Sequence, residues 1–310
     1  MTAVFLPLAL IAGLGALLRH FGEGMEPRRQ AMNLLVLYVF LPALVFHTVM
    51  DARLDRLFVE IPLIAACGML ASLAAAFAVF HFLPIPGSTK GALMLGSAFG
   101  NVTYLGLPVL LGTFPGHADA VAEVVVLFEV TNAALNLTLG AMIAIAYGSH
   151  EPITFRKTAG EAFRLPPIWA LVVAVLWKVS GVPCPEFLLQ ATAILAATVS
   201  GIMMLSLGMA LKFKPTRLMA LVLPVSAIRL LLAPLVAATV VAWLGGGGLY
   251  GHAAVLEAAM PSQLLSFIIA GRFKLDEETL AFVIMADTLL AFLTLPLIQA
   301  VVASADLATS

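Results

Sequence analysis

Long apolar stretches recur along the whole chain, and they constrain its fold more than any other feature. Residues of the set AVILMFWYC make up 62% of the 310 positions and charged residues only 11%, and the mean hydropathy is +1.08. Soluble domains contain about 25% charged residues, and a globule of this size has too little interior to hide so much apolar side chain. We therefore expect an all-α, polytopic membrane protein.

Ten stretches between clusters of charge, glycine and proline qualify as transmembrane helices, for which about 20 mostly apolar residues are needed. They are residues 3–18, 30–50, 59–80, 91–113, 121–147, 165–181, 186–211, 218–243, 249–271 and 278–302. The first and the sixth are short. The intervening loops leave no room for a separate soluble domain.

Basic residues are distributed unevenly over the loops of this ten-helix arrangement. Of the 16 Lys and Arg residues, twelve fall on one side of the membrane, three on the other, and Arg229 lies inside a span. Because cytoplasmic loops are enriched in Lys and Arg, both termini are predicted to lie outside. The formal net charge of −1 provides no basic surface for nucleic acid.

The two halves of the chain match at a nearly constant offset. Four spans of residues 1–147 recur in residues 165–310 after shifts of 156 to 159 residues, on either side of a predicted cytoplasmic linker at 148–164. Five spans in each half would insert the second half in the opposite orientation, and such inverted repeats are typical of secondary transporters. A chance alignment of evenly spaced helices is the alternative.

Helix breakers fall in the middle of the fourth and ninth spans, which occupy equivalent places in the two halves. The fourth contains Gly100, Asn101, Gly106 and Pro108, and the ninth contains Pro261. Proline removes a backbone donor and clashes with the preceding turn, and a paired interruption is the best sequence indication of a transporter's binding site. We expect both helices to be broken and to cross near the membrane centre; two ordinary proline kinks are the alternative.

The chemistry of such breaks predicts what binds there. A helix that starts inside the membrane presents unpaired N–H groups and the positive end of its dipole. Two such ends would favour a carboxylate without a fixed cation. Neutral polar residues at the same depth complete the predicted substrate site: Asn101, Thr103, Tyr104, Ser262 and Gln263.

Ionisable residues inside the spans are expected to be paired or to line a cavity, because a buried charge is costly in lipid. Arg229 has two interpretations: it binds the substrate carboxylate or a gating residue, or it forms a structural ion pair. The structural ion pair is the favoured interpretation. Glu129 and Asp287 lie at nearly equivalent places in the two repeats and are candidate proton carriers. Pairing with Arg229, or hydrogen bonding between helices, is the alternative for both.

Other polar residues extend this pattern. Asn132 and Asn136 fall on one helical stripe with Glu129, and they would line a polar path beside the broken helix as further coupling candidates. Glu257 is expected nearer the outer end of its helix, solvated at the membrane interface. His47 and His81 are expected to be hydrogen-bonded near helix ends rather than to bind a metal, because no ligand partner follows either one three or four residues later.

Four segments in order resemble the auxin efflux carrier family of membrane transporters, and the resemblance covers the whole chain. The family's fourth-helix motif is matched by GNVTYLGLPV (100–109) and its second helix by LYVFLPALVF (37–46). An Arg-to-Pro spacing in its eighth helix is matched by RLLLAP (229–234), and its ninth helix by AAMPSQLLSFIIAGRFKLDEETL (258–280).

The resemblance implies inverted five-helix repeats, in which broken helices four and nine cross between a scaffold domain and a transport domain. It implies transport of organic anions, which are auxin in plants and malonate, malate or similar acids in bacteria. Asn101, Pro108 and Pro261 match the crossover motif and so receive a substrate-site role. The chain lacks the Asn–Pro–Asn pattern and the long central loop of plant members, which favours a bacterial-type relative. The resemblance therefore implies an integral protein of a bacterial inner (plasma) membrane.

These features predict a secondary-active transporter that moves a small organic carboxylate by alternating access, coupled to H⁺, to Na⁺ or to the membrane potential alone. No cofactor and no metal are expected, and a homodimer is left open. A sodium-coupled symporter of a bulkier anion, such as a bile or sterol acid, is the first alternative. A channel or receptor is another. An intramembrane enzyme would need a catalytic motif such as HExxH, which the sequence lacks.

Overall fold

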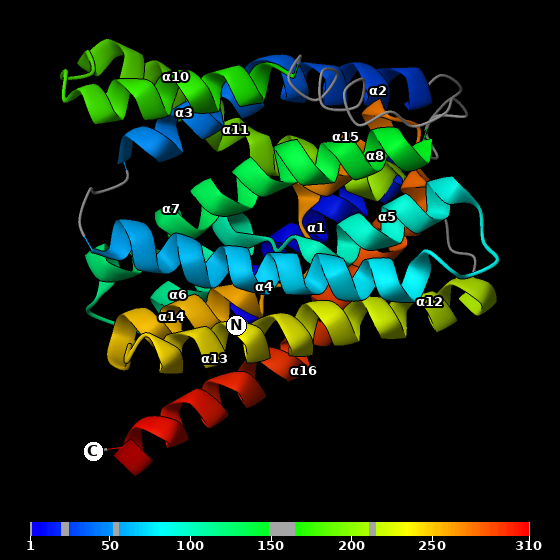
Figure 1. Ribbon diagram of the computed structural model, residues 1–310. Coiled ribbons are helices and arrows are strands. Elements are labelled where there is room, and N and C mark those ends of the chain that lie inside the picture. The colour runs from blue at the N-terminus through cyan, green and yellow to red at the C-terminus, as the bar shows by residue number, and fades with distance from the viewer. Residues whose placement is uncertain (1, 20–24, 52–55, 149–164, 211–214, 310) are drawn as a thin grey trace.

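The computed structural model describes residues 2–19, 25–51, 56–148, 165–210 and 215–309 (Figure 1). These residues form helices joined by short connections, with one isolated antiparallel pair of residues and no strand among them. Most of the predicted linker at 148–164 lies outside the described residues. The all-helical prediction is confirmed for the part of the chain that the structure describes.

The helices of the first half coincide with the first five predicted ranges. They are α1 (Thr2–Leu18), α2 (Met25–Leu35), η1 (Val36–Phe40), α3 (Leu41–Asp51), α4 (Leu57–Phe80), α5 (Gly87–Ala98), η2 (Val102–Gly106), α6 (Leu107–Thr113), α7 (Ala118–Leu135), η3 (Asn136–Gly140) and α8 (Ala141–Gly148). The η elements are π-helical turns that continue directly into the next α-helix.

The helices of the second half coincide with the remaining ranges. They are α10 (Pro166–Ser180), α11 (Glu186–Ala210), α12 (Pro215–Ala227), η4 (Ile228–Leu232), α13 (Ala233–Trp243), α14 (Gly248–Ala258), α15 (Leu264–Arg272) and α16 (Glu277–Thr309). Six helices within the described residues are long and apolar enough to cross a membrane: Pro27–Asp51, Leu57–Phe80, Ala118–Gly148, Glu186–Ala210, Ala220–Trp243 and Glu277–Val302. A count of ten crossings stays a prediction.

The outer face of α16 has the character expected of a surface in lipid. Leu289, Leu293 and Leu297 follow one another at four-residue spacing and are each more than 60% exposed. On the same helix Asp287 is fully buried. An apolar stripe of this size would be an aggregation hazard in water, whereas in a bilayer it is the ordinary surface of a transmembrane helix.

Three of the four π-helical turns have the same cause in the sequence. Pro42, Pro108 and Pro234 each stand two residues after a π turn, following η1, η2 and η4 respectively. Because a proline ring clashes with the carbonyl four residues earlier and offers no N–H, the preceding turn widens. These prolines therefore deform their helices without ending them, and the expectation that Pro108 interrupts the fourth span is wrong.

The true interruptions lie at residues 99–101 and 259–263, between α5 and η2 and between α14 and α15. The two extended segments pair with each other in antiparallel fashion around Gly100 and Ser262. The N–H of Asn101 donates to Pro261 at 2.7 Å, and the N–H of Gln263 donates to Phe99 at 2.9 Å. Non-helical backbone inside a membrane needs hydrogen-bond partners. Each extended segment supplies backbone partners for the other.

Arg229 of η4 satisfies the helix ends that the breaks leave open. Its Nε donates to the carbonyl of Met260 at 2.9 Å, one Nη to Ala98 at 2.7 Å, and the other Nη to Ala258. Ala98 and Ala258 are the last residues of α5 and α14, so the buried guanidinium faces the negative ends of two helix dipoles. No ion pair of Arg229 is found among the described residues, which corrects the expected structural ion pair.

The helices pack in two groups. In the first, α1, α2, α3, α10 and α11 contact one another; in the second, α4, α5, α7 and α8 pack with α12 to α16. Figure 1 places α2, α3 and α10 at one side of the bundle and α12, α13 and α14 at the other. The groups meet where α3 touches α7 and where α11 touches α15 and α16.

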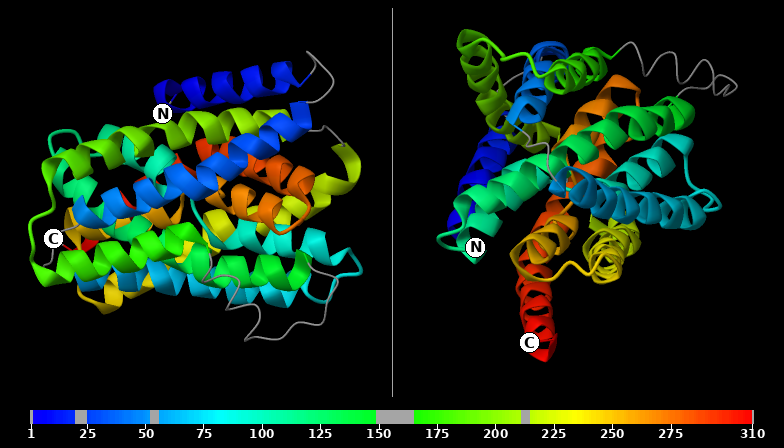
Figure 2. Two further views of the ribbon diagram at one scale, coloured as in Figure 1. Left: turned by 90° about the horizontal axis from the view of Figure 1, so that it is seen from above. Right: turned by 60° about the vertical axis from the view of Figure 1, so that its left-hand side comes forward.

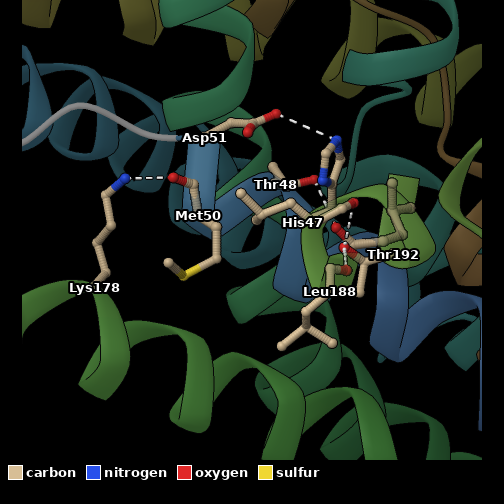
Figure 3. A network of polar contacts seen from close by, with 9 residues as sticks. His47, Thr48, Met50, Asp51, Lys178, Leu188 and Thr192 are labelled. Atoms are coloured by element: carbon tan, nitrogen blue, oxygen red, sulfur yellow. Dashed lines mark hydrogen bonds and ion pairs between the residues drawn. The ribbon is translucent and has the colours of Figure 1, made fainter. Parts of the chain in front are cut away.

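Contacts within the first group are close. Figure 2 shows α1 (blue) lying along α11 (yellow-green), where a Cβ at Gly15 or at Gly208 would collide with a backbone carbonyl of the partner helix. At the end of α3, Lys178 of α10 donates a hydrogen bond to the carbonyl of Met50 (Figure 3). Small residues that let helix backbones approach are typical of packing in membranes.

Replacing Gly15 by alanine should push α1 away from α11 and lower the free energy of unfolding by about 1–3 kcal/mol, the usual range for overpacking. Gly13 is the matched control, because a Cβ there meets nothing within 4 Å. Gly13→Ala should be neutral or slightly stabilising, since alanine favours a helix over glycine. Thermal unfolding of both variants in detergent is the measurement, and equal shifts would contradict the close helix contact.

Arg229→Gln should lower stability strongly, because three buried carbonyls lose their donor and each unpaired group costs about 1–3 kcal/mol. Arg229→Lys should recover only part of the loss, because an ammonium lacks the planar fork that spans three acceptors. Thermal unfolding measures both, with the exposed Arg28→Gln as control. A wild-type unfolding temperature for Arg229→Gln would contradict the capping role.

Candidate functional site

A small cavity lies between the two helix groups, beside the paired breaks. Its volume is about 20 Å³, room for about one water molecule. The first group contributes apolar side chains of α3 and α11, such as Leu44, Val45 and Met203. The polar lining consists of Thr48 from the first group and of Asn101, Thr103, Glu129 and Gln263 from the second.

Two helix N-termini border this cavity. Asn101 precedes η2 and Gln263 precedes α15, and neither side chain caps its own helix. The side chain of Asn101 is 2% exposed and makes no hydrogen bond among the described residues. It is therefore free to contact a bound molecule. The positive ends of two helix dipoles converge here. The carbonyls that Arg229 caps lie on the opposite side of the breaks.

Glu129 of α7 occupies this positive position. Its carboxylate lies close to Thr103, in the first turn of η2, and both residues line the cavity. The carboxylate accepts a hydrogen bond from the Gln263 amide at 3.3 Å and a long one from Asn132 at 3.4 Å. A carboxylate at a helix N-terminus is electrostatically favoured, so the protein places one of its own acids where the sequence predicts a substrate carboxylate.

Asn132 and Asn136 connect α7 and η3 to both breaks. The Asn132 amide donates to the carbonyl of Gly100 at 2.8 Å. The Asn136 amide donates to Gln263 at 2.7 Å and to Ser266 at 3.0 Å. Both side chains are fully buried, and their side-chain oxygens have no partner among the described residues. The polar stripe predicted from the sequence thus meets the crossover.

Asp287 of α16 lies on the other side of the breaks and does not line the cavity. It accepts hydrogen bonds from Ser226 of α12 and from Ser262. Ser262 also lies 2.7 Å from the carbonyl of Gly96, so its hydroxyl ties the second break to α5. For Asp287, hydrogen bonding between helices is what the structure contains, and no ion pair with Arg229 is found among the described residues.

The other predicted site residues separate into two sets. Pro261 is buried at the second break and offers its carbonyl to Asn101. Pro108 lies in the first turn of α6 and does not line the cavity. Tyr104 belongs to η2, but its side chain lies outside the described residues.

Sequence reasoning missed Glu257. It is completely buried at the end of α14, next to the second break, so the expected solvation at the membrane interface is wrong. The signal was available, since Glu257 stands only four residues before Pro261. Residues at a mid-membrane break lie far from both interfaces.

His47 and His81 lie near the ends of α3 and α4 beside polar side chains, as expected, but the reason given for His47 is wrong. Asp51 follows His47 by one turn, and the His47 Nε2 lies 3.4 Å from the Asp51 carboxylate (Figure 3). His81 is 2.6 Å from the Tyr147 hydroxyl. Among the described residues, no group of three or more His, Cys, Asp or Glu side chains could hold a metal ion.

Comparison with known proteins finds relatives among membrane transporters. A family model described as "Membrane transport protein" matches residues 1–299. An uncharacterized transporter of Methanothermobacter thermautotrophicus is 27% identical over 307 residues, 96% of each chain. An uncharacterized transporter of Methanocaldococcus jannaschii is 23% identical over 305 residues, 96% of this chain and 97% of its own. The chain therefore belongs to this family of membrane transport proteins, the auxin efflux carriers that its motifs resemble.

Proposed function

We propose that this membrane transporter moves a small organic carboxylate by secondary-active, alternating-access transport, with the acid bound at the crossover. One observation carries the proposal: two helix N-termini and the free Asn101 side chain face a cavity between two helix groups. Backbone N–H groups and helix dipoles favour an anion without a fixed cation. Arg229, the buried cation nearest the breaks, already donates hydrogen bonds to three backbone carbonyls.

The cavity's size and position support the alternating-access step. A volume of about 20 Å³ is too small for a dicarboxylate, so binding and release require the two helix groups to move apart. The first group would be the scaffold domain and the second, which carries both breaks, the transport domain. A small cavity between them also favours a small acid over a bulky sterol acid.

Glu129 is the proposed coupling residue. A substrate carboxylate in this cavity would stand beside the Glu129 carboxylate, and two unit charges about 4 Å apart repel by roughly 4 kcal/mol at an effective dielectric constant of about 20. Protonation of Glu129 removes the repulsion and weakens its hold on the Gln263 amide, which can then donate to the substrate. Anion and proton would then move together. Asp287 is less suited to this role, since it does not line the cavity.

The remaining topology belongs to the same proposal. Ten crossings in two inverted five-helix repeats would place both termini outside the cell, with the cytoplasmic face at the Lys- and Arg-rich loops. The coincidence of helices with the predicted ranges supports the ten crossings, and the equivalent positions of the two breaks support the repeat. The lipid bilayer and the acid are the proposed partners.

Proteoliposomes containing the purified protein should accumulate labelled malonate or malate and should exchange it in counterflow. Asn101→Ala should weaken substrate affinity roughly 10- to 150-fold, because a hydrogen bond to a charged group contributes about 1.5–3 kcal/mol. Thr113→Ala, outside the cavity on the same segment, is the control. An absence of uptake for any organic anion by folded protein would refute the proposal, and unchanged affinity in Asn101→Ala would remove that residue from the site.

Wild-type uptake should rise as the outside pH falls, because a proton must reach Glu129 before the anion binds. Glu129→Gln mimics the protonated acid and should make uptake independent of pH. Asp287→Asn is the comparison and should keep the wild-type dependence. Initial rates measured across a pH series at constant membrane potential distinguish the two. A pH dependence lost in Asp287→Asn but kept in Glu129→Gln would assign the coupling to Asp287 instead.

A further inference from the structure

A second acid at the crossover has no role in the proposed binding step. Glu257 is fully buried, and neither of its carboxyl oxygens has a hydrogen-bond partner among the described residues. The carboxyl group lies against the backbone of η2, where a Cβ at Gly106 would collide with both oxygens. An ionised carboxylate buried without donors is strongly penalised, so the group requires a proton or a bound cation.

The one buried cation nearby does not meet this requirement. Arg229 and Glu257 interact electrostatically, but all three guanidinium nitrogens donate to backbone carbonyls. Glu129 on α7 adds a negative group to the surroundings of Glu257, and Asp287 on α16 adds another to those of Arg229. Of these three buried carboxyl groups, Glu257 and Asp287 interact electrostatically with the one guanidinium. If all were ionised, the crossover would carry an uncompensated negative charge inside the membrane.

The helices packed against α14 offer no other cation. They are η2, α4, α7, α13 and α16. Their remaining ionisable residues are Tyr104 of η2, Glu60 and Cys67 of α4, Asp119 and Glu123 of α7, and Glu277, Glu278 and Asp306 of α16, with none on α13. None of these side chains is a Lys or Arg. A metal ion is also disfavoured, because hard cations take six or more oxygen ligands and the described residues provide no acidic cluster that could hold one.

The contact with Gly106 links Glu257 to the substrate cavity. Gly106 is the last residue of η2, and the same turn follows Asn101 and contains Thr103, both of which line the cavity. The dry contact between the carboxyl group and Gly106 is compatible only with a neutral acid. Loss of the proton would demand water at this contact, and water could enter only if η2 moved away from α14.

We propose that Glu257 is a second proton-binding site, which holds a proton while α14 and η2 are in contact and releases it when they separate. The proposal rests on the proposed anion transport, which it deepens: two acids, Glu129 in the cavity and Glu257 behind it, bind protons during the cycle. Glu129 would respond to the substrate and Glu257 to the movement of the transport domain.

Infrared spectroscopy of the full-length protein in lipid nanodiscs at neutral pH tests the proton directly. A protonated carboxyl group has a C=O stretching band that a carboxylate lacks and that shifts in D₂O. Glu257→Gln should lose intensity in this band relative to wild type, whereas Glu186→Gln, at an exposed position, should leave it unchanged. Loss of carboxylate bands instead, or disappearance of the wild-type band on replacing choline by sodium, would overturn the proposal.

Transport measurements separate this proposal from the proposed function. In proteoliposomes Glu257→Gln should keep counterflow exchange of labelled malonate but lower the accumulation that a given pH gradient drives, because only the proton of Glu129 remains coupled to the anion. Accumulation equal to that of the wild type would overturn the coupling role. The infrared measurement does not depend on transport. It therefore tests the protonation of Glu257 even if the protein takes up no malonate. Should Glu257→Gln not fold, ¹³C-glutamate labelling of Glu129→Gln decides: a remaining protonated glutamate band supports the assignment, and its absence overturns it.

Discussion

The need to pair every backbone polar group inside lipid determines the structure of the crossover. Two helices that stop within the membrane leave carbonyls at one end and N–H groups at the next. The extended segments at 99–101 and 259–263 satisfy part of this need by bonding to each other. Arg229 satisfies the carbonyl ends. The N-termini of η2 and α15 have no such permanent partner. These two N-termini form the candidate site.

The two poles of the crossover are therefore treated differently. At the carbonyl pole a permanent charge, Arg229, is built into the core and holds α5 and α14 together. At the N–H pole the charge is Glu129, an acid that in the proposed mechanism is neutralised by a proton and replaced by the substrate carboxylate. A permanent partner suits a structural joint, whereas an exchangeable one suits a transporter that must bind and release its substrate.

Hydropathy and loop charge were sufficient to locate the helices, because apolar run length is a property of the sequence alone. Proline was a less reliable guide. Pro108 and Pro42 produce π turns within continuous helices, and the real first break, at Gly100, depends on pairing with a segment more than 150 residues away. The unpaired carboxyl of Glu257 and the use of Arg229 as a double helix cap likewise depend on long-range packing, which no local pattern encodes.

The central claim is that a substrate carboxylate replaces Glu129 at the two N-termini. An experimental structure with malonate bound tests it most directly. The account predicts a carboxylate within hydrogen-bonding distance of the Thr103 N–H and the Asn101 side chain, with the Glu129 side chain moved off the start of η2. Malonate bound away from the breaks, with Glu129 still accepting from the Gln263 amide, would contradict it.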